Sequence, residues 1–231
     1  MKPLILALLL FLSPACRPGS AGVDDPAATV LVEGAGFSDL YGPVGWAGTG
    51  WYIATRDNAS VVLTAGHVCM AASDGLAMSF YDAAGRPAYA VWDNDETDLC
   101  LLLVDGPAPA VIPLAETEAT PGDRVTYRGY PGGTLGFYRG DVVQVDRAGN
   151  ILVSIAGFYG ASGSAVVRDG RAVGVLVAGH MDHGPAGAIV ATGLGDLRVA
   201  KAEAEAVLDR LESAPLETVL EAVRGSIMGD R

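Results

Sequence analysis

The chain has 231 residues, which is the length of one large domain or two small ones. Half of its residues are hydrophobic and only 18% are charged, and this composition excludes an intrinsically disordered protein. The net charge of −12 repels nucleic-acid phosphates and anionic lipid headgroups, so we expect no nucleic-acid partner. The 31 glycines, nearly twice the usual ~7%, predict frequent turns between short elements and favour an all-β fold.

The N-terminus has the pattern of a secretory signal peptide. Lys2 supplies a positive charge, and the apolar run 4–12 is too short to cross the ~30 Å hydrocarbon core of a membrane as a helix. Cleavage after Ala15 resembles the processing of a bacterial lipoprotein and would leave Cys16 as a lipid anchor, whereas cleavage after Ala21 would release an ordinary secreted protein. Either site predicts an exported protein, periplasmic or extracellular, with the lipid anchor as its only expected membrane attachment.

Beyond residue 28 the chain contains eleven short β-type runs bounded by turn residues. They are 50–55, 60–64, 76–81, 88–92, 99–104, 124–130, 141–146, 151–155, 164–168, 172–178 and 188–192. No amphipathic helical pattern separates them, which favours antiparallel barrels or sandwiches over alternating strands and helices. From residue 196 onwards alanine, glutamate and leucine recur at helical spacing, so we expect a helical tail.

Three short segments carry side chains that nucleophilic catalysis uses. An apolar run ends in a small-residue turn with His67, an acidic loop leads into a second run with Asp98 at the junction, and a glycine-flanked Ser162 precedes a third run. A serine hydroxyl is a weak nucleophile, so acyl transfer needs an imidazole that accepts its proton and a carboxylate that orients the imidazole. Each motif alone has an ordinary structural explanation, but the three together, in this order, predict a catalytic triad.

The three motifs resemble those of trypsin-like serine peptidases of the chymotrypsin fold, and they are most similar to the motifs of bacterial HtrA-like proteases and glutamyl endopeptidases. They read TAGH at 64–67, DLCLL at 98–102 and GASGS at 160–164. The resemblance extends from about residue 29 to residue 197. It implies an all-β fold of two six-stranded antiparallel β-barrels with a C-terminal helical tail.

Together, the signal pattern, the resemblance and the helical spacing of the last residues divide the chain into a signal peptide at 1–21, a trypsin-like peptidase domain at 22–198 and a helical tail at 199–231. It implies a serine endopeptidase that hydrolyses polypeptide substrates through an acyl-enzyme intermediate. Two alternatives are an esterase with the same triad and a catalytically silent, protease-like module that binds polypeptides. The presence of all three triad residues argues against the silent module, because a binding module does not need them.

The resemblance also implies that the amides of Gly160 and Ser162 hold the oxyanion, and that the reaction needs no metal or organic cofactor. His180 and His183 have a spacing that could bind zinc. Their position on a loop after an apolar run is more typical of exposed or groove-lining side chains. We therefore expect no metal site.

The resemblance also implies which residues form the primary specificity pocket, by their position relative to the serine. Its base corresponds to Ala156 and its wall to Val177, Ala178 and Gly179. A pocket for Lys or Arg would need an acidic residue at its base, because an unpaired buried charge is costly, and Ala156 supplies none. We therefore expect a small apolar pocket that prefers Val, Ala or Leu before the scissile bond. The histidines of the following loop leave a preference for acidic residues as the second alternative.

Two cysteines of the exported chain each follow a triad residue by two positions: Cys69 follows His67, and Cys100 follows Asp98. Because His67 and Asp98 must lie side by side in a triad, both cysteines are brought into one small region. Export places them in an oxidising compartment, so we predict a disulfide between them. The alternative is a pair of reduced, buried thiols that pack as small hydrophobic side chains.

Overall fold

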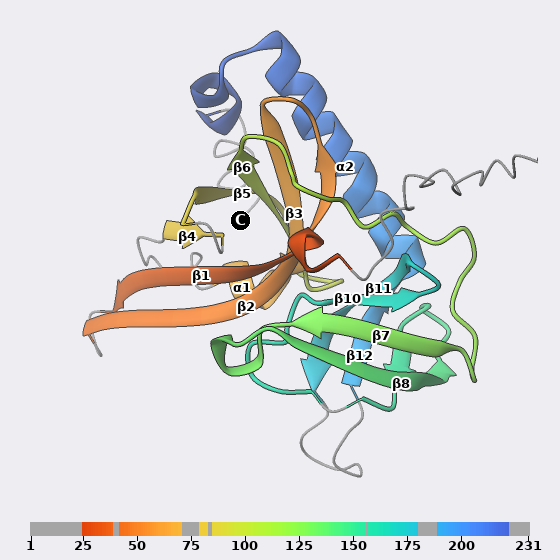
Figure 1. Ribbon diagram of the computed structural model, residues 1–231. Coiled ribbons are helices and arrows are strands. Elements are labelled where there is room, and N and C mark those ends of the chain that lie inside the picture. The colour runs from red at the N-terminus through yellow and green to blue at the C-terminus, as the bar shows by residue number, and fades with distance from the viewer. Residues whose placement is uncertain are drawn as a thin grey trace, which may run out of the picture.

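The structure is a computed structural model that describes residues 25–38, 42–70, 79–82, 85–155, 157–179 and 189–221. These residues form two closed six-stranded antiparallel β-barrels, and a long C-terminal helix runs along both (Figure 1). The predicted fold class is therefore confirmed. The signal segment with its cleavage sites and Cys16 lies outside the described residues, as do the predicted pocket residue Ala156 and the loop histidines His180 and His183.

The first barrel closes in the order β1-β2-β3-β6-β5-β4. Its strands are β1 (Thr29–Ser38), β2 (Gly42–Thr55), β3 (Ala59–Ala65), β4 (Ser79–Tyr81), β5 (Pro87–Asn94) and β6 (Leu99–Asp105). Because alternate residues of a strand point to opposite faces, Val62 and Leu102 fill the barrel interior, while Leu63 and Leu101 join a core shared with the second barrel and the C-terminal helix. Both faces of β3 and β6 are buried, which explains why these runs are apolar almost throughout.

The second barrel closes in the order β10-β11-β12-β9-β8-β7. Its strands are β7 (Arg124–Gly129), β8 (Gly136–Val145), β9 (Ile151–Val153), β10 (Ala165–Arg168), β11 (Arg171–Gly179) and β12 (Ile189–Gly193). The second of two short 3-10 helices, η2 (Pro131–Gly133), connects β7 to β8, and the first, η1 (Pro26–Ala28), precedes β1. The loop that carries Ser162 precedes β10, so the predicted nucleophile belongs to the second barrel, whereas His67 and Asp98 belong to the first.

The β1–β2 hairpin is a long ribbon (Figure 1), of which the sequence analysis predicted only residues 50–55 of β2. Frequent glycines weaken the strand pattern in this segment. Gly34 is required because the ring of Trp46 lies over it, and a Cβ at this position would overlap that ring. Trp46 Nε1 in turn donates to the Val68 carbonyl at 2.9 Å. The ribbon therefore supports the short helix α1 (Gly66–Met70), which follows β3.

Helix α2 (Leu194–Ser213) contacts β2, β3 and β6 of the first barrel and β11 and β12 of the second. Its buried residues recur at helical spacing: Leu194, Leu197, Ala200, Ala204, Val207 and Leu208. Arg56, next to the end of β2, forms ion pairs with Glu205, Asp209 and Glu212 of this helix. The helix thereby fixes how the two barrels face each other. Within the described ranges, no helix is long and apolar enough to cross a membrane.

Candidate active site

His67 lies in the first turn of α1, directly after β3. The preceding residue, Gly66, has no room for a side chain, because a Cβ there would lie 2.8 Å from Asp98 Oδ1. The Gly66 amide also donates to the Asp98 carbonyl at 2.7 Å. The small-residue turn that the sequence shows before the histidine thus lets the start of α1 pack directly against Asp98.

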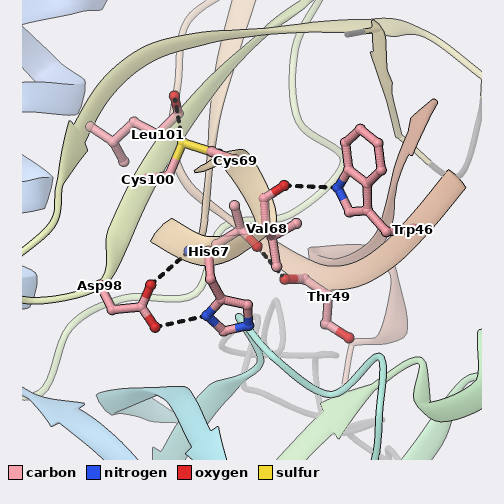
Figure 2. Close-up of a disulfide and its surroundings, with 9 residues drawn as sticks. Trp46, Thr49, His67, Val68, Cys69, Asp98, Cys100 and Leu101 are labelled. Carbon is pink, nitrogen blue, oxygen red and sulfur yellow. Dashed lines mark hydrogen bonds and ion pairs between the residues drawn. A yellow bond between two sulfur atoms is a disulfide. The ribbon is translucent and has the colours of Figure 1, made fainter. Parts of the chain in front are cut away.

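Asp98 contacts His67 through both carboxylate oxygens (Figure 2). Its Oδ2 lies 2.8 Å from His67 Nδ1, and its Oδ1 accepts the His67 backbone amide at 2.6 Å. A carboxylate at Nδ1 keeps the imidazole proton on that nitrogen and leaves Nε2 able to accept a proton. The histidine side chain is 45% exposed and the aspartate side chain 30%. The structure therefore brings the predicted base and its orienting carboxylate together, with the base open to solvent.

The backbone of Asp98 has a φ of 53°, a left-handed conformation that is uncommon for any residue except glycine. It is held on one side by the Gly66 amide on the Asp98 carbonyl. On the other side, Thr192 Oγ1 on β12 donates to the Thr97 carbonyl at 2.8 Å. A strained backbone conformation persists only where several surrounding contacts hold it in place, and such conformations are frequent at functional sites. The second barrel thus helps to hold the aspartate of the first.

The predicted disulfide between Cys69 and Cys100 is confirmed (Figure 2). It joins α1 to β6, with a Cα–Cα distance of 6.4 Å, across a sequence separation of 31 residues. Both cysteines are buried. The bridge therefore ties together the two elements that carry His67 and Asp98.

We expect the double variant Cys69→Ala, Cys100→Ala to lose about 3–4 kcal/mol of unfolding free energy, because a cross-link over a loop of this length restricts the unfolded chain. Urea unfolding followed by circular dichroism measures the loss. Wild-type protein treated with a reductant is the matched control and should lose stability by a similar amount. Unchanged stability after reduction would contradict the expectation.

The loop that carries Ser162 is packed against the first barrel. Gly163 has a φ of 88°, and its Cα lies so close to the Thr49 carbonyl and the Thr64 hydroxyl that a side chain would overlap both. The Thr49 amide donates to the Ser162 carbonyl at 2.8 Å. Only glycine satisfies both the positive φ and the close approach, which explains the residue that follows the serine.

Gly48 on β2 lies between Ser162 and the helix that carries His67. A Cβ at Gly48 would lie 2.7 Å from the Val68 side chain and 3.3 Å from the Ser162 carbonyl oxygen. A single glycine thus separates the backbone of the serine from the residue that follows the histidine. The structure therefore places all three predicted triad residues at the interface between the two barrels.

The orientation of the peptide group between Tyr159 and Gly160 is fixed by a hydrogen bond that its carbonyl accepts. The Gly132 amide donates to the Tyr159 carbonyl at 3.0 Å. Because a trans peptide points its C=O and its N–H in opposite directions, this bond turns the Gly160 amide away from Gly132. Gly160 itself has a φ of 94°, and a Cβ there would lie against the Tyr130 carbonyl, so glycine is required.

The peptide group before Ser162 is fixed in the same way. The Ala161 carbonyl accepts the Ser164 amide at 3.0 Å and the Ser164 hydroxyl at 2.7 Å. Ser164 is fully buried, so the Ser162 amide on the opposite side of this peptide points toward the outside of the loop. The two amides that the sequence analysis assigned to the oxyanion are thus each held by a bond to the carbonyl of the same peptide.

The predicted pocket wall, Val177, Ala178 and Gly179, forms the end of β11 and pairs with β12 over its last two residues. The strand lies beside the serine loop, because the Gly163 amide donates to the Leu176 carbonyl at 2.7 Å. Val177 is half-buried and packs against both hydrophobic clusters. Of the three predicted wall residues, Val177 therefore places an apolar side chain close to the strand position that contacts the serine loop.

Two aromatic residues directly before Gly160 were missed by the sequence analysis. Phe158 is 53% exposed and Tyr159 is 88% exposed. Phe158 also contacts Tyr138 of β8, with the ring centroids 6.0 Å apart. Exposed apolar side chains that gather on a surface often mark a site of contact with a ligand or partner. The sequence could have indicated them, because they directly precede the glycine–serine motif at 160–164.

The part of the chain that the structure describes contains no group of three or more His, Cys, Asp or Glu residues that could hold a metal ion. Burial raises the pKa of Tyr130, which follows β7 beside the serine loop, so its phenol stays neutral at physiological pH.

Comparison with known proteins found a similar fold and a matching family. The serine endoprotease from Yersinia pestis has a similar structure, with a TM-score of 0.58 and 22% sequence identity. The match covers 83% of this chain but only 64% of that one, so the chain spans less than two thirds of the Yersinia protein. No curated protein matches the sequence. The model of the trypsin-like peptidase domain matches residues 48–175, more than half of the chain, which therefore belongs to the family of trypsin-like peptidases.

Proposed function

We propose that this protein is an exported serine endopeptidase with the triad His67, Asp98 and Ser162. The observation that carries the proposal is the contact of His67 Nδ1 with Asp98 Oδ2 at 2.8 Å, beside a serine loop whose peptide groups are fixed. A catalytically silent binding module needs neither feature. Several classes of hydrolase use such a triad, and the family to which the chain belongs supports a peptidase rather than an esterase.

In this proposal Ser162 Oγ attacks the scissile carbonyl carbon while His67 Nε2 takes the hydroxyl proton. The amides of Gly160 and Ser162 donate to the oxyanion of the tetrahedral intermediate. The intermediate collapses, the C–N bond breaks, and the imidazolium returns its proton to the leaving amine. Water then attacks the acyl-enzyme with His67 again as base. Asp98 orients the imidazole and stabilises its charged form throughout.

The disulfide supports export, since such bonds persist in oxidising compartments and are rare in the cytosol. Whether the exported protein carries a lipid on Cys16 depends on which signal cleavage takes place. Mass spectrometry of the mature N-terminus after expression in a bacterial host would distinguish the two cleavages: a lipidated Cys16 supports the anchor, and Gly22 as first residue supports free secretion.

We expect the enzyme to prefer Val, Ala or Leu before the scissile bond, because the apolar strand end at Val177 supplies no charge to pair with a basic side chain. A peptide library with mass-spectrometric identification of cleavage sites measures this preference. Matched peptide and ester substrates in the same assay separate a peptidase from an esterase. Dominant cleavage after Arg or Lys would contradict the assignment of the pocket, and ester hydrolysis without peptide cleavage would contradict the peptidase.

A further inference from the structure

Thr49 on β2 is fully buried, and each of its polar groups is used at the boundary between the barrels. Its amide donates to the Ser162 carbonyl at 2.8 Å, and its carbonyl accepts the Thr64 hydroxyl at 2.7 Å. Its own hydroxyl donates to the Gly160 carbonyl at 2.7 Å and accepts the Tyr130 amide at 2.9 Å. One side chain of the first barrel thus joins two segments of the second.

The two peptide groups that flank Gly160 determine where its amide points. The group before it is held by Gly132 of the turn Pro131–Gly133. The peptide group after it is held at both ends: its carbonyl accepts the Thr49 hydroxyl, and its amide, that of Ala161, donates to the Phe158 carbonyl at 2.9 Å. A glycine has access to conformations that other residues cannot adopt, so without such bonds both groups could rotate.

The Thr49 hydroxyl also connects these two restraints. It accepts the amide of Tyr130, the residue that begins the turn, and donates to the Gly160 carbonyl. Because a hydroxyl has one proton, the bond to Gly160 commits that proton and leaves the lone pairs for Tyr130. The position of the turn and the conformation of Gly160 are therefore coupled through a single oxygen atom.

We propose that Thr49 is a positioning residue that holds the Gly160 amide in its oxyanion-binding orientation, a role that rests on the proposed peptidase function. Removal of the hydroxyl would leave the half-buried Gly160 carbonyl and Tyr130 amide without their partner, and such groups rearrange to find another one. The amide would then spend part of its time away from the oxyanion. Substrate binding, which uses other parts of the groove, would change little.

The test compares wild-type protein with Thr49→Val, which removes the hydroxyl, and Thr49→Ser, which keeps it. We expect Thr49→Val to lower kcat for a peptide substrate about 10- to 100-fold, less than the ~10²–10³-fold loss for deletion of an oxyanion donor itself. KM should change less than about threefold, because transition-state contacts are lost and ground-state contacts are kept. Thr49→Ser should restore most of kcat.

A peptide boronic acid provides a second readout, because its tetrahedral adduct with serine places an oxygen in the oxyanion site. Its affinity for Thr49→Val should fall by about the same factor as kcat, since both report stabilisation of the same charge. Ser60→Ala is the matched control: Ser60 is also buried in the first barrel, but its hydroxyl has no hydrogen-bond partner among the residues that the structure describes. This variant should keep wild-type kcat and boronate affinity.

A folded Thr49→Val protein with wild-type kcat and boronate affinity would overturn the role of Thr49 alone. The role would also be overturned if the whole loss of kcat came from a smaller fraction of protein with a functional active site, because that result indicates only a structural role. If Thr49→Val does not fold, Thr49→Cys weakens the donor at similar volume and should lower kcat and boronate affinity together; unchanged values would overturn the proposal. A wild-type protein without peptidase activity would overturn the proposed function itself, and this role with it.

Discussion

Ser162→Ala and His67→Ala should each lower kcat for peptide cleavage by a factor on the order of 10⁶. The nucleophile and the base act as one unit, because the serine hydroxyl reacts only when the imidazole takes its proton. The double variant should therefore be little slower than either single variant. Single-turnover cleavage of a fluorogenic peptide measures the residual rates.

Ser213→Ala, at the end of α2, is the matched serine control and should keep the wild-type rate. Thermal unfolding of each variant verifies that the fold is retained. Substantial peptidase activity in purified Ser162→Ala protein would remove this serine from the mechanism. Strictly additive losses in the double variant would show that His67 and Ser162 act independently.

Asp98→Asn should keep the fold but lower kcat by a factor of about 10⁴. In the wild-type protein the carboxylate accepts hydrogen bonds from both the side chain and the backbone amide of His67. An amide nitrogen at the same place would donate to Nδ1 and force the imidazole proton onto Nε2, which could then no longer accept the proton of the serine.

Asp95→Asn is the matched control for this change, because Asp95 lies exposed in the same acidic loop. It should retain wild-type kcat. The dependence of kcat on pH distinguishes a changed tautomer from a general loss of structure, and a folded Asp98→Asn protein with kcat within about tenfold of wild type would contradict the role of the carboxylate.

The sequence predicted those parts of the site that local patterns encode. The apolar runs of β3 and β6 are buried on both faces, and each has a residue of the proposed triad just beyond one end: His67 follows β3 and Asp98 precedes β6. The disulfide could be predicted because Cys69 and Cys100 stand in the same relation to these two residues. In each case the position of a residue relative to a strand or to a neighbouring residue in the sequence was enough to predict where it lies in the fold.

Other features depend on contacts between segments far apart in the chain. Strand β1 and the first part of β2 were missed because their glycines look unfavourable for a strand. Gly34, for example, is explained only once the ring of Trp46 is placed over it. Thr49 is an ordinary residue of an apolar strand until Gly160 and Tyr130 are brought to its hydroxyl across 111 and 81 positions of the sequence. No local pattern indicates such a role.

The most direct test of the triad is the reaction of the intact, disulfide-bonded protein with a fluorophosphonate probe, followed by mass spectrometry of the labelled peptides. A phosphonate forms a covalent bond with a serine only when that serine is activated as a nucleophile. We predict a single adduct, located on Ser162, that is absent in Ser162→Ala and forms far more slowly in His67→Ala. No adduct on the folded wild-type protein, or an adduct on Ser164 in place of Ser162, would contradict the proposed triad.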